Sequence, residues 1–196
     1  MAKESAFVGI AFDVANQLLH DSQFQIARKA ALLYRITVDN QLSVRVDVRK
    51  PMRGKSAFET DLCVFEKRIA TNGDAILIPR VVMEFKTSIT THDMLTYSVK
   101  AKQTKQIYPY LRYGMVAENQ KKVQGLFFAH NESLDFCASV ADLADVELSK
   151  FFSALLRSEI AYSQKLEAVS FDKANVKSRL YQNVPMFDGV PSSQAF

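Results

Sequence analysis

Two extended apolar runs separated by a short turn constrain the fold of this chain more than any other feature. Residues 58–68 and 75–86 are both strand-like, and residues 71–74, Thr-Asn-Gly-Asp, are a typical turn between them. Pro79 interrupts the second run, because proline cannot donate a backbone hydrogen bond to a neighbouring strand. Apolar residues lie on both faces of residues 81–86, which indicates a strand buried within a sheet.

The segments before this pair are predicted from composition and period. Residues 4–34 are rich in Ala, Leu, Gln and Phe and contain no Pro, which predicts one long helix or two helices broken near residues 20–22. Residues 42–49 alternate apolar and polar side chains, the period of a half-exposed strand, and Pro51 and Gly54 mark the turn that ends it. These residues are therefore expected to form the first arm of a hairpin with the strand that follows.

The segments after the pair complete the predicted order. Residues 92–112 have helical spacing, with a kink or an early end at Pro109, and residues 145–166 read as another helix. Residues 125–129 are short and apolar and are predicted as a buried strand, whereas residues 185–196 are expected to be irregular. The order predicts a mixed α/β domain whose central sheet has about four to five strands and helices on both sides.

Composition limits the class of protein. The 196 residues are 48% apolar and 23% charged, which is ordinary for one globular domain spanning residues 1–196. No stretch approaches the roughly 18 apolar residues of a membrane helix, and the chain does not start like a signal peptide, so a cytoplasmic protein without a membrane partner is expected. Cys63 and Cys137 are far apart and lack zinc-site spacing, which favours two reduced core residues.

The charge is unevenly distributed along the chain. Its formal value is only +4, but residues 28–55 hold eight basic side chains against two acidic ones. Residues 100–122 are also basic, whereas residues 132–149 hold five acidic side chains and no Lys or Arg. A solvated helix face explains any one cluster, but two basic blocks beside an acidic one favour a polyanionic partner.

The residues with chemical potential lie on the two extended runs. Asp61 stands at the head of an apolar run, and a buried carboxylate is costly unless a cation or a strong donor compensates it. Period two places Glu84 and Lys86 on one face of the second run and Met83 and Phe85 on the other. If the strands are neighbours, Asp61 and Glu84 can converge on one hard cation, with the Phe85 backbone carbonyl as a further oxygen ligand. Mg²⁺ or Mn²⁺ suits this set, and Lys86 can orient or help deprotonate water, which is the chemistry of phosphodiester hydrolysis.

These residues resemble the motif of the PD-(D/E)XK nucleases. Asp61 matches the first acid, with Thr60 where the motif often has Pro, and residues 84–86 match the (D/E)XK element. The resemblance implies a restriction-endonuclease-like core at about residues 43–128 and a helical C-terminal part at about residues 145–182. It also implies a Mg²⁺-dependent deoxyribonuclease in which Mn²⁺ can substitute, with Asp61, Glu84 and Lys86 as its catalytic residues.

The family resemblance extends to weaker elements. Gln106 and Tyr110 are similar to a QxxxY element of some branches, although Gln103 would serve equally well. Family members often draw another acid from the first helix, and both Glu4 and Asp13 are candidates here. The residues expected to contact DNA share a polar or basic side chain on or just before the helix that follows the motif. They are Thr87, Ser88, Lys100, Lys102, Gln103, Lys105 and Gln106.

The expected role is a restriction or defence endonuclease acting on DNA, with a homodimer as a possible assembly by family analogy. Two alternatives stay open: a catalytically silent DNA-binding or assembly subunit with a nuclease fold, and a DNA repair or recombination nuclease. Bland alternatives also exist for single residues, because Asp61 can accept backbone hydrogen bonds at a strand start and the tyrosines near residues 97–113 can be core residues. No GxGxxG, GxxxxGK[ST] or GxSxG string occurs, which disfavours dinucleotide, P-loop and hydrolase-elbow sites.

Overall fold

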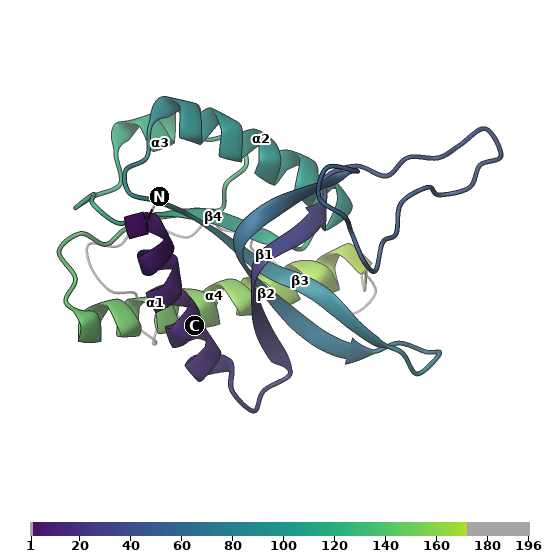
Figure 1. Cartoon of the computed structure of the whole chain (residues 1–196), viewed down its shortest axis with the longest axis horizontal. Coiled ribbons are helices and arrows are strands. Elements are labelled where there is room, and N and C mark those ends of the chain that lie inside the picture. The colour runs from purple at the N-terminus through teal and green to yellow at the C-terminus, as the bar shows by residue number, and fades with distance from the viewer. Residues whose placement is uncertain (1, 172–196) are drawn as a thin grey trace.

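The computed structural model describes the backbone of residues 2–171 and the side chains of residues 6–171. One helix and three consecutive strands come first in this range, and helices and strands alternate after them (Figure 1). The elements are α1 (Ala2–Leu19), β1 (Phe24–Leu33), β2 (Ala57–Ile69), β3 (Ala75–Lys86), α2 (Thr91–Ile107), β4 (Arg112–Ala117), α3 (Gly125–His130), β5 (Phe136–Ser139) and α4 (Asp145–Phe171).

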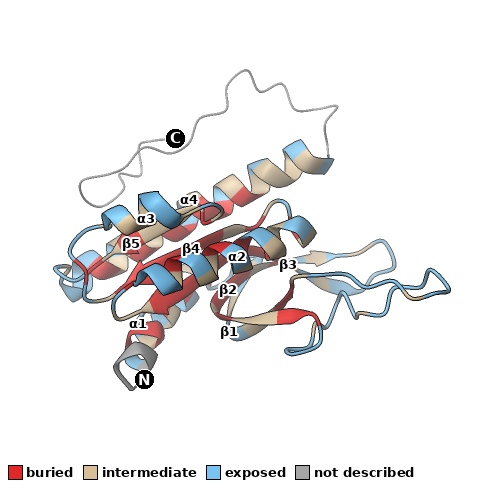
Figure 2. Ribbon diagram, turned by 90° about the horizontal axis from the view of Figure 1, so that it is seen from above, coloured by how far each residue is buried: buried red, intermediate tan, exposed pale blue. Residues whose placement is uncertain are grey.

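The strands form one mixed five-stranded sheet in the order β1-β2-β3-β4-β5. Strands β1, β2 and β3 are an antiparallel meander, whereas β4 and β5 run parallel to β3 and are reached through α2 and α3. Helices α1 and α4 cover one face of the sheet, and α2 and α3 lie on the other (Figures 1 and 2). The predicted α/β class, the strand number and the helices on both sides are therefore confirmed.

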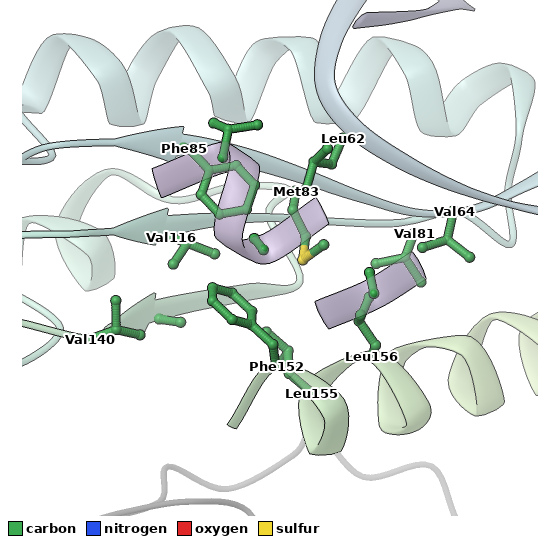
Figure 3. Packing of buried hydrophobic residues seen from close by; sticks show 14 of the residues in the cluster. Leu62, Val64, Val81, Met83, Phe85, Val116, Val140, Phe152, Leu155 and Leu156 are labelled. Atoms are coloured by element: carbon green, nitrogen blue, oxygen red, sulfur yellow. The ribbon is translucent and has the colours of Figure 1, made fainter. Parts of the chain in front are cut away.

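Two apolar cores separate the sheet from its two layers of helices. Figure 3 shows the first, in which Met83 and Phe85 of β3 pack toward Phe152 of α4. The second core contains Val82 of β3 with residues of β4 and α2. Alternation along β3 thus places Met83 and Phe85 on the α1/α4 face and leaves Glu84 on the α2 face, as the period of two predicted.

The first part of the chain differs from the prediction in one respect. The break near residues 20–22 is confirmed, because α1 ends at Leu19, but the residues that follow form β1 rather than helix. Residues from Phe24 to Leu33 pair with β2 over most of their length, and this tertiary pairing outweighs the modest helical preference of the segment.

The predicted strand at residues 42–49 is also wrong. Residues 34–56, called the arm below, leave the sheet between β1 and β2 and project beyond it (Figure 1). Within the arm only isolated bridges occur, such as the one between Val38 and Val44. The alternation is that of an exposed segment, and β1 takes the place beside β2 that this segment was expected to fill. The strand expected at residues 58–68 is confirmed as β2, and Gly73 at φ +85° forms the predicted turn into β3.

A second expected strand is a helix. Residues 125–129, predicted as a buried strand, belong to α3, of which no residue is buried. A short apolar run does not distinguish strand from helix by period, and β4 and β5 occupy the parallel positions beside β3. The helix predicted at residues 92–112 is confirmed in α2, which begins with a Thr90–Asp93 capping box and ends before Pro109.

The remaining predictions have mixed outcomes. The expected helix at residues 145–166 is confirmed in α4, and the interruption at Pro79 is confirmed as a register shift opposite Val64 and Phe65. Cys63 is buried and Cys137 is half-buried, and both are free thiols. Residues 185–196 and the end of the predicted C-terminal part lie outside the described residues.

Among residues 2–171, no helix combines the length and the apolar character needed to cross a membrane.

Candidate active site

The predicted site lies where β2 separates from both of its neighbours. Pairing between β2 and β3 runs from the hairpin turn as far as Leu62 and Met83 and stops there. On the other side, Lys29 of β1 has a left-handed φ of 54° and falls at a gap in the ladder with β2, opposite Asp61. Asp61 therefore lies at an interruption of both ladders, where backbone groups must find other partners.

Side chains of the motif residues supply those partners. The Phe85 backbone N–H donates to Asp61 Oδ2 over 2.8 Å, and the Asp61 N–H donates to Glu84 Oε2 over 3.3 Å. The Tyr113 hydroxyl, which comes from β4, donates to Glu84 Oε1 over 2.5 Å. The strands therefore bring Asp61 and Glu84 together as the sequence predicted. Asp61 also accepts a backbone hydrogen bond, which was the purely structural alternative for this residue.

Burial and repulsion shape the protonation of this pair. Glu84 is only 2% exposed. Burial, followed by the negative charge of Asp61, raises the pKa of Glu84 to about 7, although the Tyr113 hydrogen bond and the Lys100 charge oppose the rise. Burial and the nearby Glu84 also raise the pKa of Tyr113 well above its usual value, which keeps that hydroxyl a donor. The pair thus has more negative charge than its surroundings stabilise, a condition that a bound cation would relieve.

The two carboxylates open onto a surface hollow of about 430 Å³. Tyr97 and Lys100 of α2 line it, and Arg53 at the base of the arm lines it as well. Aromatic rings of Tyr34 and Phe58 complete much of the wall and stack on each other with their centroids 4.2 Å apart. The hollow therefore combines oxygen ligands, cations and aromatic surface in one place.

Two lysines share the Tyr97 ring beside the carboxylates. Lys100 Nζ lies 4.6 Å from the ring centroid, and Lys86 Nζ lies 5.4 Å from it. Lys100 Nζ also lies 5.6 Å from the Phe58 centroid, so this ammonium is held by two aromatic rings. The sequence placed Lys86 in the site and Lys100 only among DNA contacts, whereas the structure places Lys100 in the wall of the hollow.

The geometry of β3 fits an oxygen-ligated ion at this position. The Phe85 N–H points toward β2, and the N–H and C=O of one strand residue point to the same side. The Lys86 carbonyl points the other way, because it accepts from the Glu118 N–H over 2.9 Å on the β4 side. The Phe85 carbonyl is thus directed toward the gap that holds Asp61 and Glu84, and three hard oxygen ligands face one region.

Side chains alone do not complete a metal site in the described part of the chain. Residues 6–171 contain no group of three His, Cys, Asp or Glu side chains close enough to hold an ion. The predicted set depends on two carboxylates and one backbone carbonyl, with water or phosphate oxygens for the remaining positions. Of the two candidate acids on α1, Asp13 is exposed, and the side chain of Glu4 lies outside the described residues.

Several predicted DNA contacts lie away from the hollow. Lys102 Nζ pairs with Glu132 over 3.4 Å, and Lys105 Nζ pairs with Asp135 over 2.7 Å, so both side chains face the segment before β5. Four further predicted contacts do not line the hollow: Thr87, Ser88, Gln103 and Gln106. Gln103 is half-buried and Gln106 exposed on α2, while half-buried Thr87 and exposed Ser88 lie in the turn after β3.

The QxxxY spacing does not lie on one helix. Helix α2 ends at Ile107, and Tyr110 packs on Phe171 with ring centroids 6.1 Å apart. Its ring also lies 5.1 Å from the Arg80 guanidinium carbon. Of the tyrosines between residues 97 and 113, Tyr97 lines the hollow and Tyr113 contacts Glu84.

Comparisons with known proteins add no assignment. No family model matches the chain, and no curated protein matches its sequence.

Proposed function

We propose that this protein is a Mg²⁺-dependent deoxyribonuclease with a restriction-endonuclease-like fold of the PD-(D/E)XK type. One observation carries the proposal: two carboxylates from neighbouring strands meet at the edge of an open hollow. The Glu84 carboxylate accepts from the Asp61 backbone N–H, and the Asp61 carboxylate accepts from the Phe85 backbone N–H. The antiparallel meander, the helix and the parallel strand that surround the motif support it. The uneven basic charge supports DNA as the polyanionic partner.

The residues of the hollow then take distinct roles. Asp61, Glu84 and the Phe85 carbonyl would hold the ion, which would supply positive charge to polarise the phosphate and to acidify water. Lys86 orients the attacking water, and the ammonium of Lys100 on α2 contacts the phosphate from the wall of the hollow. Hydrolysis joins the water oxygen to phosphorus and breaks the bond to the leaving ester oxygen, which takes up a proton.

The cellular role that we favour is a cytoplasmic restriction or defence endonuclease, and a homodimer would place two such sites on opposite DNA strands. This step depends on family analogy. A repair or recombination nuclease would use the same residues on a different DNA substrate, and the choice between plasmid and single-stranded DNA in the assay below separates the two.

A second candidate, a silent DNA-binding or assembly subunit, is favoured by one specific observation. Both oxygens of Glu84 already accept hydrogen bonds, from Tyr113 and from the Asp61 N–H. A carboxylate used only in this way would stabilise the gap between β2 and β3 without binding an ion.

A cleavage assay decides between the two functions. Supercoiled plasmid and single-stranded DNA are incubated with the purified chain in Mg²⁺, in Mn²⁺ and in EDTA, and the variants Asp61→Asn and Glu84→Gln are run beside it. We expect ion-dependent cleavage that falls about 100-fold or more in both variants, because each removes charge from the ion site. The matched control is Asp142→Asn, which removes the same charge from an exposed residue that does not line the hollow and pairs with Lys121.

The outcomes separate cleanly. Cleavage by both variants at the wild-type rate places the active site elsewhere. DNA binding without cleavage by the wild-type chain, in either ion and on both substrates, establishes the silent subunit instead.

A further inference from the structure

The arm concentrates exposed apolar side chains. Six large hydrophobic residues of this 34–56 segment are exposed, and Leu42 at its tip is 86% exposed. Figure 2 shows the arm as an almost wholly exposed loop that extends beyond the sheet. The six residues are Ile36, Val38, Leu42, Val44, Val48 and Met52. Apolar surface gathered on a projecting segment marks an interaction site more often than scattered exposed residues do.

The tip of the arm is held in one conformation. Asp39 Oδ1 accepts from the Gln41 and Ser43 backbone N–H groups over 2.8 and 2.9 Å. The Arg45 guanidinium pairs with the same carboxylate. Leu42 has a left-handed φ of 61° within this turn, so its side chain is presented on an ordered loop.

The arm is also strongly basic. It contains six Lys or Arg residues and only two acidic ones. Arg49 pairs with Asp74 of the β2–β3 turn over 2.6 Å, which ties the arm to the sheet. Lys50 and Lys55 are exposed along the same segment. An apolar tip between cationic flanks complements a polyanion that also offers apolar surface, and duplex DNA has both in its grooves.

The base of the arm borders the hollow. Tyr34, Arg53 and Gly54 belong to the arm and line the hollow together with Asp61 and Glu84. A polymer whose backbone reaches the carboxylates would therefore extend along the arm. This continuity favours nucleic acid over a membrane surface or a second copy of the chain as the occupant.

We propose that the arm binds duplex DNA beside the hollow, with Leu42 inserted in the minor groove against a base step and the flanking cations on phosphates. The inference rests on the proposed function for its choice of substrate. An inserted leucine partly unstacks the step and anchors the duplex along the arm, whose base borders the hollow.

The first test replaces the tip residue. Leu42→Asn removes the apolar side chain, and asparagine tolerates the left-handed backbone, so the turn is retained. Binding of the full chain to a 2-aminopurine-labelled duplex is measured in EDTA, where cutting is blocked. We expect fluorescence of the probe to rise with the wild-type chain, and we expect Leu42→Asn to lose that rise and to bind about tenfold more weakly. Val146→Asn on α4, an exposed apolar site away from the arm, is the matched control.

The second test concerns the cations. Lys50→Gln with Lys55→Gln should flatten the slope of log K against log salt by about one to two, since each phosphate contact contributes about 0.9. A double variant of exposed α4 residues, Lys150→Gln with Arg157→Gln, removes the same charge and should leave the slope unchanged.

Four results overturn the inference. If Leu42→Asn binds DNA, raises the probe fluorescence and cuts like the wild type, the arm is not part of the DNA interface. The proposed function is not contradicted by that result. Equal slope changes in the two double variants reduce the effect to net charge. A wild-type dimer that Leu42→Asn converts to a monomer in light scattering makes a second copy the occupant. If the wild-type chain neither binds nor cuts any DNA, the proposed function fails as well.

Discussion

Replacing Glu84 by glutamine should stabilise the ion-free protein at alkaline pH. Burial and the adjacent Asp61 raise the pKa of Glu84 from 4.5 to about 7. Each tenfold change in proton affinity is worth about 1.4 kcal/mol, so ionised Glu84 costs the folded state about 3 kcal/mol above pH 7. Glutamine has no charge to lose or gain and avoids this cost.

The sign follows from the direction of the pKa change. Below pH 4.5 the carboxyl is protonated in both the folded and unfolded chain, and its contribution does not depend on pH. As the pH rises from 4.5 to about 7, the unfolded chain releases the proton first, and the wild-type protein loses stability. The stability difference between Glu84→Gln and wild type should therefore grow by about 3 kcal/mol between pH 4.5 and pH 8. Any hydrogen bond lost to Tyr113 or to the Asp61 N–H cancels from this comparison.

Urea unfolding in EDTA at several pH values measures the difference. Asp142→Asn serves as the control for net charge, because it removes one exposed acidic charge outside the hollow. Adding Mg²⁺ at pH 8 should then raise the wild-type unfolding free energy and leave that of Glu84→Gln nearly unchanged. If the stability difference between Glu84→Gln and wild type stays constant with pH, ionisation of Glu84 does not destabilise the folded protein. A cation is then not needed to neutralise this carboxylate.

Three further predictions concern other residues. Lys86→Ala should abolish cleavage while DNA affinity stays within about twofold, because the ammonium acts on the attacking water and the transition state; wild-type cutting would exclude that role. Gly114→Ala should lower the unfolding free energy by about 1–3 kcal/mol, since the added Cβ would meet the Phe136 ring at 2.3 Å; an unchanged urea midpoint would contradict this. Burial opposes ionisation of Glu66 and Glu167, but their arginine partners outweigh it and lower both pKa values. The free energy of unfolding should therefore fall as the pH drops below 4.5. Glu167→Gln should weaken this pH dependence in urea unfolding.

Local sequence patterns correctly predicted the β2–β3 hairpin and the helix that follows it. Strands β2 and β3 and the turn between them follow from two apolar runs around Asn-Gly, and α2 follows from its helical spacing and the Pro109 stop. Strand β1 was predicted as helix because its strand character comes from pairing with β2, 24 or more residues later in the chain. Strand β4 was missed for a similar reason, since a short run beside a helix is placed in the sheet only by its parallel partner.

The candidate site was predicted to the same extent. Period two on β3 placed Glu84 correctly, and the hairpin brought Asp61 beside it. The sequence did not reveal Tyr113 or the position of Lys100, because both reach the carboxylates from elements whose packing no local pattern specifies. It also assigned the alternation at residues 42–49 to a sheet, whereas those residues extend into solvent.

The identity of the residues at the gap argues for more than a structural role. The N–H groups of Asp61 and Phe85 and the Tyr113 hydroxyl need only hydrogen-bond acceptors. Uncharged acceptors such as the oxygen of an amide side chain would meet that need without placing two like charges together. Two carboxylates instead cost about 3 kcal/mol above neutral pH, through the raised pKa of Glu84. A bound cation would offset the cost of the Glu84 charge and so explain why a carboxylate stands at this position. The hollow beside Glu84 gives a cation access to it.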